Sequence, residues 1–141
     1  MSTPNVKQVV PVLMVASMEH SLRYYVDGLH FERKNQWIVD GRIRWCWLEL
    51  GGAAIMLQEY TREGPNAWKP EGNAGAGISL WFQCADSIAL YDEFRARGIE
   101  ADEPFVGNGL WDMRLPDPDG YWLHFESPTD VPEETKLSAV R

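Results

Sequence analysis

The chain contains the same pattern twice, at an offset of about seventy residues. Residues 10–32 form an apolar run, an amphipathic helix pattern, a glycine and an apolar residue, and residues 77–101 repeat this order. The ends of the two halves also correspond, because residues 51–59 (GGAAIMLQE) match residues 119–127 (DGYWLHFES). Two copies of one supersecondary unit predict a pseudo-symmetric sheet that encloses a cavity between its halves. The function is therefore expected at the positions where the two copies differ.

The first half predicts a strand, a helix and then three more strands. Residues 9–15 are short, β-branched and apolar, as in a buried strand. Ser17 is suited to cap a helix whose apolar spacing ends at Gly28, a residue that favours a left-handed stop. The dipeptide Asp40-Gly41 favours a type I′ hairpin turn. The three further strands are expected at residues 33–39, 42–50 and 53–59.

The second half repeats this βαβββ order with weaker strand patterns. Asp86 is the expected helix cap, and Gly98 is the expected stop. A turn at residues 117–120 is expected to set the strand register. Around it we expect a loop at residues 104–110 and strands at residues 111–115 and 121–126.

The expected fold class is α+β. Two tandem βαβββ modules form a cupped, eight-stranded mixed sheet, with a helix on the outer face of each module. The length fits a single domain that buries its own core. The polar tail is expected to be frayed or used at a subunit contact. The boundaries are 6–60 for module one, 61–76 for the linker, 77–128 for module two and 129–141 for the tail.

Composition excludes several classes of partner. The net charge of −8 and the scattered basic residues argue against a nucleic-acid binder, which needs a clustered basic face. The longest apolar run, residues 9–16, is too short to span a bilayer, and no signal-peptide pattern is present. Cys46 and Cys84 lie in apolar strand patterns, as expected of reduced, buried thiols. A cytoplasmic protein that binds neither nucleic acid nor membrane is expected.

Strand alternation separates a purely apolar face from a second face that is rich in tryptophan. The apolar face is suited to pack under the helices. The second face combines large aromatic rings with a few polar groups, whereas a solvent-washed face would carry lysine, threonine and arginine. This mixture is typical of a small-molecule pocket. The predicted ligand-binding residues are Trp45, Trp47, Glu49, Met56, Gln58, Ser79, Trp81, Gln83, Trp122, His124 and Glu126.

Four segments resemble the vicinal-oxygen-chelate superfamily, which contains glyoxalase I, bleomycin-resistance proteins, extradiol dioxygenases and fosfomycin-resistance enzymes. The segments are VPVLMV, SLRYYVDGLHF, ALYDEFRARGI and DPDGYWLHFE, and the resemblance covers residues 6–128. It implies paired βαβββ modules around a cup. Because the superfamily spans many chemistries, the resemblance identifies the fold far better than the activity.

Metal-using members of that superfamily present ligands on the cup face of the first and last strand of each module. The matching positions are Val10, Met56, Ser79 and His124, of which only His124 is a good ligand for a divalent metal. We therefore expect neither a metal site nor another cofactor. This departure resembles the bleomycin-resistance branch, whose members bind drugs without metal. That branch forms dimers with aromatic clefts between subunits, and its acidity attracts cationic glycopeptides.

The resemblance and the tryptophan-rich face together favour a metal-independent homodimer that binds an aromatic or cationic small molecule, for which an antibiotic is one candidate. Whether the protein is also an enzyme stays open. One alternative is a glyoxalase-like lyase, isomerase or dioxygenase with an atypical divalent-metal site, or with His124 and Glu126 as an acid–base pair. Another alternative is a regulatory module that binds a metabolite.

Two further assignments concern residues near the expected pocket. His124 could be a pocket histidine that is hydrogen-bonded to Glu126, to Gln58 or to a backbone group. Trp37, Trp68 and Trp111 lie in hairpin or loop segments, where they could close over the cleft or a subunit interface.

Overall fold

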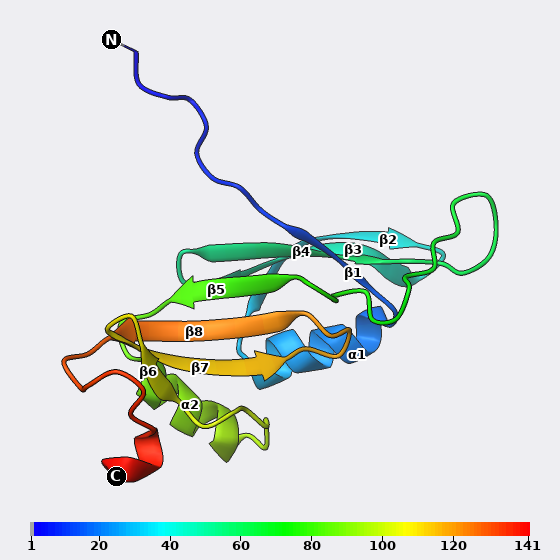
Figure 1. Ribbon diagram of the computed structural model, residues 1–141. Helices are drawn as coiled ribbons and strands as arrows, with labels where there is room; N and C mark the ends of the chain where they lie inside the picture. Colours follow the sequence, from blue (N-terminus) through cyan, green and yellow to red (C-terminus); the bar gives the residue numbers. More distant parts are fainter. Residues whose placement is uncertain (1) are drawn as a thin grey trace.

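The structure, a computed structural model, describes residues 2–141 and consists of two βαβββ modules (Figure 1). Module one contains β1 (Val12–Val15), α1 (Met18–Leu22), the π-helical segment η1 (Arg23–Gly28), β2 (Glu32–Val39), β3 (Arg42–Leu50) and β4 (Ala53–Glu59). Module two contains β5 (Ser79–Gln83), α2 (Ser87–Ala96), β6 (Phe105–Gly107), β7 (Leu110–Pro116) and β8 (Trp122–Pro128). A short 3₁₀ helix, η2 (Leu137–Ala139), follows. Within residues 2–141, none of the helices has the length and apolar character needed to cross a membrane.

Each module builds its own four-stranded mixed sheet. The strand orders are β1-β4-β3-β2 and β5-β8-β7-β6. In both sheets the first strand pairs in parallel with the last, and the other pairs are antiparallel. The expected pair of βαβββ modules is thus confirmed. The strands form two hydrogen-bonded sheets and not one continuous sheet.

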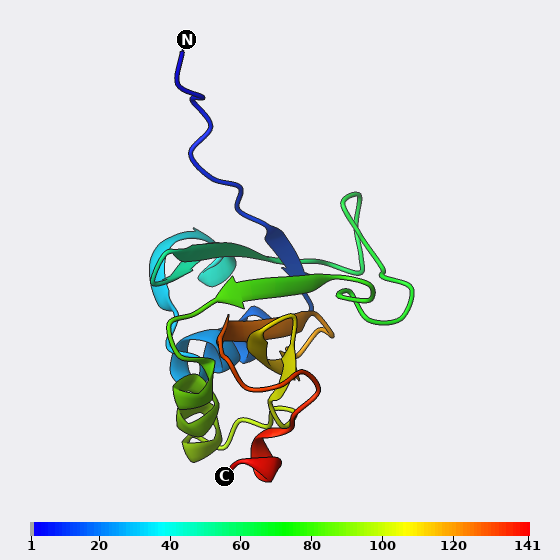
Figure 2. The same ribbon diagram turned by 60° about the vertical axis from the view of Figure 1, so that its left-hand side comes forward.

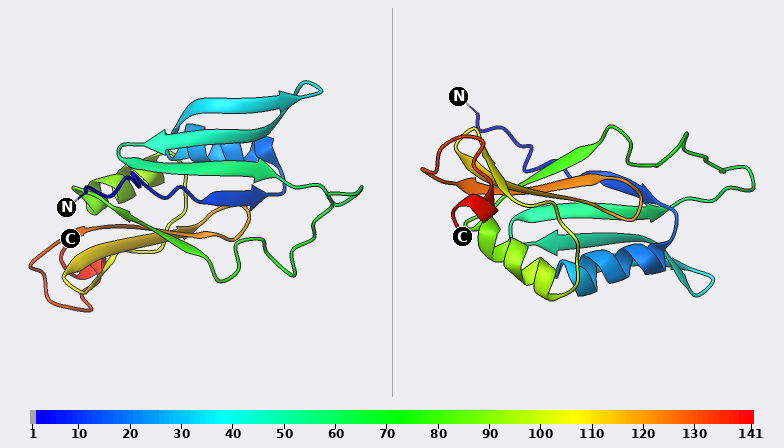
Figure 3. Two further views of the ribbon diagram at one scale, coloured as in Figure 1. Left: turned by 90° about the horizontal axis from the view of Figure 1, so that it is seen from above. Right: turned by 60° about the horizontal axis from the view of Figure 1, so that its bottom comes forward.

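Both helices lie on the same side of the two sheets (Figures 1 and 3). In module one, α1 contacts β3 and β4, and in module two, α2 contacts β7 and β8. The apolar residues expected under the helices are buried there, among them Leu48, Leu57, Leu123 and Phe125. They belong to one core that extends through both modules. The opposite face of each sheet is not covered by a helix, and we call it the open face.

Both predicted helix caps are confirmed. Ser17 accepts a hydrogen bond from the backbone N–H of His20 at 3.2 Å, and Asp86 accepts one from the backbone N–H of Ala89 at 3.0 Å. These bonds satisfy donors that have no partner within the helix. Gly98 adopts the expected left-handed conformation after α2, with φ of 81°.

The left-handed stop predicted at Gly28 is wrong. The left-handed residue after the first helix is His30, with φ of 70°. A Cβ atom at Gly28 would instead lie 2.8 Å from Cδ1 of Ile99 in module two, which is the movable end of a side chain. Its carbonyl also accepts a hydrogen bond from Arg97 Nε at 2.6 Å. The glycine therefore lets the end of the first helix approach the end of the second.

The predicted hairpin turn in module one is confirmed. Asp40 and Gly41 both have positive φ, of 52° and 75°, as a type I′ turn requires. Asn108 and Gly109 adopt similar values, 54° and 72°, between β6 and β7. Residues 104–110, expected to be a loop, therefore contain the strand β6 and a tight turn.

The C-terminal tail packs against module two, so of its two expected states, a frayed end and a subunit contact, the frayed end is wrong. Val106 in β6 donates its N–H to the carbonyl of Thr135 at 2.9 Å, and Leu137 donates to the carbonyl of Pro104 at 2.9 Å. Leu137 is buried against Val106 and Trp111 in a second, small core. These contacts from residues distant in the sequence stabilise β6 in addition to its pairing with β7.

Residues 2–11 form an extended arm that leaves the body of the molecule (Figures 1 and 2). The strand predicted at residues 9–15 is consequently shorter than expected, and Val9 is 90% exposed. Pro11 accepts one hydrogen bond from the N–H of Met56 at 2.9 Å. Because proline has no N–H, it cannot return a bond to β4, and the pairing of the two strands ends there.

The turn between β7 and β8 links module two to module one through hydrogen bonds. The carboxylate of Asp117 accepts hydrogen bonds from Tyr25 Oη at 2.6 Å and from the N–H groups of Asp119 and Tyr121 at 2.8 and 2.9 Å. Asp119 accepts a further bond from the N–H of Ala16 at 2.9 Å. Burial raises the pKa of Asp117, and burial also raises the pKa of Tyr25. The turn expected to set the register thus also joins the two modules.

The two cysteines are free thiols, and we expect Cys46 to be almost inert. Its Sγ lies 3.8 Å from Met18 Sδ under α1, and burial raises its pKa to about 11. Because the thiolate is the reactive form, Cys46 should react with iodoacetamide at pH 8 about a hundredfold more slowly than an exposed thiol. Mass spectrometry of timed samples measures this rate, with urea-unfolded protein as the control. Equal rates in native and unfolded protein would contradict the burial of Cys46.

Candidate functional site

The open face of the module-one sheet brings five of the predicted residues together. Cross-strand pairing places Trp45 opposite Gln58 and Trp47 opposite Met56. All four of these residues are partly buried. Glu49 lies near the end of β3 and accepts a hydrogen bond from Trp47 Nε1 at 3.1 Å. The five side chains therefore form one continuous surface.

At one end of this face, the linker borders a cavity of about 280 Å³. The cavity is lined by Trp37 and Gln58 from the sheet and by Trp68 from the linker. Trp68 packs edge-on against Tyr60, with ring centroids 5.1 Å apart. Trp37 and Trp68 thus border a cavity beside the predicted site. Trp111 does not, because it is buried in the small core of module two.

The open face of the module-two sheet carries the other predicted residues. The cross-strand pairs are Ser79 with Trp122, Trp81 with His124, and Gln83 with Glu126. The indole of Trp81 stacks on the imidazole of His124, with ring centroids 3.7 Å apart and an interplanar angle of 9°. Trp81 is 52% exposed, whereas His124 is 9% exposed. The indole therefore covers the histidine.

The hydrogen-bond partner of His124 is Asp112 of β7. Nδ1 of His124 lies 3.0 and 3.1 Å from the two carboxylate oxygens of Asp112. Glu126 accepts a hydrogen bond from Gln83 Nε2 at 2.6 Å. The expected partners of His124, which were Glu126, Gln58 or a backbone group, are therefore wrong. The histidine and carboxylate that pair in this protein are His124 and Asp112.

The sequence alone does not identify Asp112 as a site residue, because the position of Asp112 depends on the register between two strands. It lies directly opposite Glu126, and its neighbour Arg114 lies opposite His124. Period-two alternation in β7 places Asp112 and Arg114 on the same face. The turn at residues 117–120 fixes this register, so it is the one sequence signal from which Asp112 could have been found.

The other imidazole nitrogen of His124 faces outward. Nε2 makes no hydrogen bond within the described residues, whereas Nδ1 is held by Asp112. Throughout residues 2–141, every buried side-chain nitrogen or oxygen has a partner. Nε2 is consequently in contact with solvent, and it is the atom that the histidine presents to a ligand.

A cavity of about 700 Å³ lies along β5, the edge strand of the module-two sheet. Its walls are the N-terminal arm, the β3–β4 turn and β5 itself. Ser79, Trp81 and Gln83 line it. The cavity is thus bordered by both modules, and it includes three residues of the predicted site.

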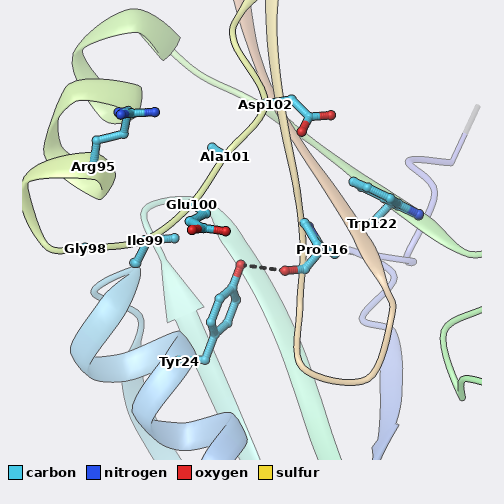
Figure 4. Close-up of a pocket in the computed structure, with 9 residues that line it drawn as sticks. All are labelled: Tyr24, Arg95, Gly98, Ile99, Glu100, Ala101, Asp102, Pro116 and Trp122. Carbon is cyan, nitrogen blue, oxygen red and sulfur yellow. Dashed lines mark hydrogen bonds between the residues drawn. The ribbon is translucent and has the colours of Figure 1, made fainter.

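A further cavity of about 770 Å³ lies where the two helices approach each other (Figure 4). It is lined by Tyr24, residues 98–102, Pro116 and Trp122. The hydroxyl of Tyr24 donates to the carbonyl of Pro116 at 3.1 Å, and burial raises the pKa of this tyrosine. Trp122 is the one predicted residue that lines this cavity, so it borders a different space from Trp81.

A sequence model of the Glyoxalase/Bleomycin resistance protein/Dioxygenase superfamily matches residues 6–125. The chain belongs to this superfamily. The match extends through both modules, as the resemblance of the four sequence segments implies. A comparison with curated proteins found no match.

Solved structures share the superfamily fold at low sequence identity. TnmS3, an antibiotic binding protein from Streptomyces sp. CB03234, has a TM-score of 0.68 and 19% identity, over 90% of this chain and 100% of that chain. TioX from Micromonospora sp. ML1 has a TM-score of 0.67 and 17% identity, over 86% and 99% of the two chains. A glyoxalase/bleomycin resistance protein/dioxygenase from Nocardioides has a TM-score of 0.66 and 18% identity, over 96% and 92%. At these identities the likeness establishes the fold alone.

The metal positions of the superfamily do not fit a metal in this chain. They correspond to Val10, Met56, Ser79 and His124. His124 is the one strong ligand among them, and Val10 lies in the arm before β1. The residues that stand opposite Met56 and His124 are Val12 and Trp81, which supply no better ligand. Across residues 2–141, no group of three or more His, Cys, Asp or Glu side chains is arranged to hold a metal ion.

Proposed function

We propose that the protein is a metal-independent binding protein that holds an aromatic or cationic small molecule against the tryptophans of its open faces. The observation that carries this proposal is the continuous surface of Trp45, Trp47, Met56, Gln58 and Glu49. Large aromatic rings beside a few polar groups are typical of ligand pockets. The weak donor set at the superfamily's metal positions supports binding without a metal.

An antibiotic is the candidate ligand that we favour. TnmS3, which shares the fold, is an antibiotic binding protein. The net charge of −8 would attract cationic drugs to this chain over long distances. Together with the tryptophans, this charge suits a ligand that carries both a flat ring and a positive group.

We further propose that the protein works as a homodimer in the cytoplasm. Trp37 and Trp81 are each more than half exposed, at 58% and 52%, on surfaces that no helix covers. Large apolar side chains exposed on such surfaces favour burial at an interface. A second copy would cover them and would close clefts between the subunits. The free thiols suit a reducing compartment.

Trp47→Ala is expected to weaken ligand binding by about 1–3 kcal/mol, the range for the loss of one stacked aromatic contact. Trp47 lies at the centre of the module-one surface, so its loss should remove stacking while the core beneath remains intact. Tryptophan fluorescence titrated with bleomycin-type drugs measures the affinity. Val140→Ala is the control, because Val140 is an exposed apolar residue near the C-terminus, outside both open faces.

Two results would contradict this proposal. No quenching of the wild-type protein at micromolar drug would exclude the antibiotic as ligand. Quenching with equal affinity in the wild type and in Trp47→Ala would exclude the module-one tryptophan surface as the place of binding.

A second candidate function is metal-free enzymatic acid–base chemistry, which one observation favours. An Asp–His pair with the second imidazole nitrogen open is the arrangement that orients histidine as a general base. Asp112 and His124 have this arrangement. The enzyme alternative therefore concerns this pair, in place of His124 and Glu126.

A further inference from the structure

Asp112 determines the hydrogen-bonding character of the open face of module two. Because a carboxylate only accepts hydrogen bonds, the Nδ1 atom that faces Asp112 at 3.0 and 3.1 Å carries the imidazole proton. In neutral His124, Nε2 is then an acceptor. His124 is 9% exposed, and Nε2 has no hydrogen-bond partner among residues 2–141. A nearly buried acceptor of this kind suits a ligand that brings a donor.

The neighbouring polar groups on this face also present acceptors. Gln83 Nε2 donates to Glu126 Oε1 at 2.6 Å, which leaves Gln83 Oε1 and Glu126 Oε2 outside this bond. Trp81 Nε1 donates to Ser79 Oγ at 2.9 Å. The indole N–H and one N–H of Gln83 are thus engaged, while the second N–H of Gln83 lies outside these bonds. The acceptors that remain for a ligand are an imidazole nitrogen, a carboxylate oxygen and an amide oxygen.

Two nearly buried carboxylates give this surface a negative charge. Asp112 and Glu126 lie opposite each other on β7 and β8 and are 7% and 9% exposed. Their hydrogen-bond partners are an imidazole and an amide, which are neutral when the imidazole is unprotonated. Arg114, the basic residue of β7, donates from Nε to Asp102 at 2.7 Å. Because a buried charge is unfavourable without a counter-charge, a cationic ligand would stabilise this surface.

Trp81 offers a stacking surface beside these acceptors. One face of its indole lies on the imidazole of His124, yet about half of the residue is exposed. Flat rings and cations both bind favourably to an indole face. Because the lone pair of Nε2 lies in the imidazole plane, a planar cation that donates to Nε2 would lie beside the imidazole, against the same face of the larger indole. Glu126 lies two residues further along β8 on the same face.

We propose that Trp81, Gln83, His124 and Glu126 form a binding site for a planar aromatic cation that carries N–H donors, such as an amidinium or guanidinium attached to an aromatic ring. Asp112 is the positioning residue that keeps Nε2 an acceptor. This inference rests on the proposed function, narrows its ligand class, and places the cationic end of the ligand on module two.

Calorimetric titration with 2-naphthamidine and 2-naphthoate tests the ligand class, because the two probes have the same ring and opposite charges. The wild type is expected to bind the amidine at least about tenfold more tightly. His124→Phe keeps a flat ring against Trp81 but removes Nε2. It is expected to weaken amidine binding about tenfold or more, with binding of the naphthoate unchanged.

Asp112→Asn tests the positioning role. The asparagine amide can donate to Nδ1, which would move the imidazole proton to Nε2 and turn the acceptor into a donor. Nitrogen-15 NMR should show the Nδ1–H tautomer of His124 in the wild type and the Nε2–H tautomer in Asp112→Asn, with a loss of amidine affinity of about tenfold or more. Asp92→Asn makes the same change of charge at an exposed position on α2. It should match the wild type in both measurements.

Several outcomes would overturn this inference. They are equal affinity for the two probes, unchanged amidine binding in His124→Phe, and an Nε2–H tautomer in the wild type. Drug binding that depends on Trp47 but not on His124 would leave the proposed function intact while this site fails. If the wild type bound neither the amidine nor the drug, both proposals would fail.

Discussion

Replacing Asp117 with alanine is expected to lower the free energy of unfolding by about 4 kcal/mol. The carboxylate accepts three hydrogen bonds, from Tyr25 Oη at 2.6 Å and from the N–H groups of Asp119 and Tyr121 at 2.8 and 2.9 Å. Alanine would leave all three buried donors without a partner, and each such donor costs about 1–3 kcal/mol. Urea-induced unfolding followed by circular dichroism measures the change.

Asp117→Asn is the matched control and should cost about 1 kcal/mol or less. Both backbone bonds end on the same oxygen of Asp117, which asparagine retains as Oδ1, and Nδ2 can donate to the Tyr25 hydroxyl. Burial raises the pKa of Asp117, so the native state binds this proton more tightly than the unfolded chain does. The free energy of unfolding of the wild type should therefore fall as pH rises through that raised pKa, and Asp117→Asn should lack this pH dependence. If Asp117→Ala and Asp117→Asn were equally stable, the stabilising role of the three hydrogen bonds to Asp117 would be excluded.

Gly75→Ala is expected to destabilise the protein by about 3 kcal/mol. At Gly75 the linker runs against the β7–β8 turn, where its N–H donates to the carbonyl of Asp119 at 2.9 Å. An added Cβ would lie 2.5 Å from the carbonyl carbon of Gly120 and would overlap the backbone nitrogen of Tyr121. Because the obstacle is backbone, no change of rotamer relieves it, and the linker has to move away from the turn.

Gly52→Ala provides the comparison for this substitution. Gly52 also lies in a turn, but an added Cβ would meet no atom within 4 Å, and its φ is not positive. Its effect on the free energy of unfolding should stay within about 0.5 kcal/mol. The same urea titration measures both variants. If Gly75→Ala proved as stable as Gly52→Ala, the close contact between linker and turn would be excluded.

Local sequence patterns predicted most of the fold, because each depends on residues that are close in the chain. The caps at Ser17 and Asp86 need only a side-chain oxygen and the N–H three residues later. The Asp40-Gly41 hairpin needs only two residues that tolerate positive φ. Alternation in β3 correctly separated the core residues from the tryptophans of the open face.

Contacts between distant residues could not be predicted in this way. The contact between the tail and β6 at Val106 joins segments that are far apart in the sequence, whereas the Asn108-Gly109 turn after β6 is a local hairpin signal. The late start of β1 at Val12, in contrast, follows from a local feature, because Pro11 has no N–H to donate to β4. Only the contact between the tail and β6 therefore depends on a partner segment and not on the residues themselves.

The same difference between local patterns and distant contacts applies to the candidate site. Alternation placed the predicted residues on the open faces, but it could not say how they pair across strands. The pairing of His124 with Asp112 depends on the register of β7 and β8, and this register is fixed by the turn at residues 117–120. For the same reason the sequence could not show that Trp122 and Trp81 border separate cavities.

The π-helical segment η1 makes the two halves of the repeat complementary. A wider helical turn holds more residues, so consecutive side chains are separated by a smaller angle about the axis than in an α-helix. Tyr24 and Tyr25 can consequently both reach module two, where their hydroxyls donate to the carbonyl of Pro116 and to the carboxylate of Asp117. The helix of module two is α-helical throughout Ser87–Ala96. At these two contacts the donors come from module one and the acceptors from module two, so the two halves of the repeat are not interchangeable there.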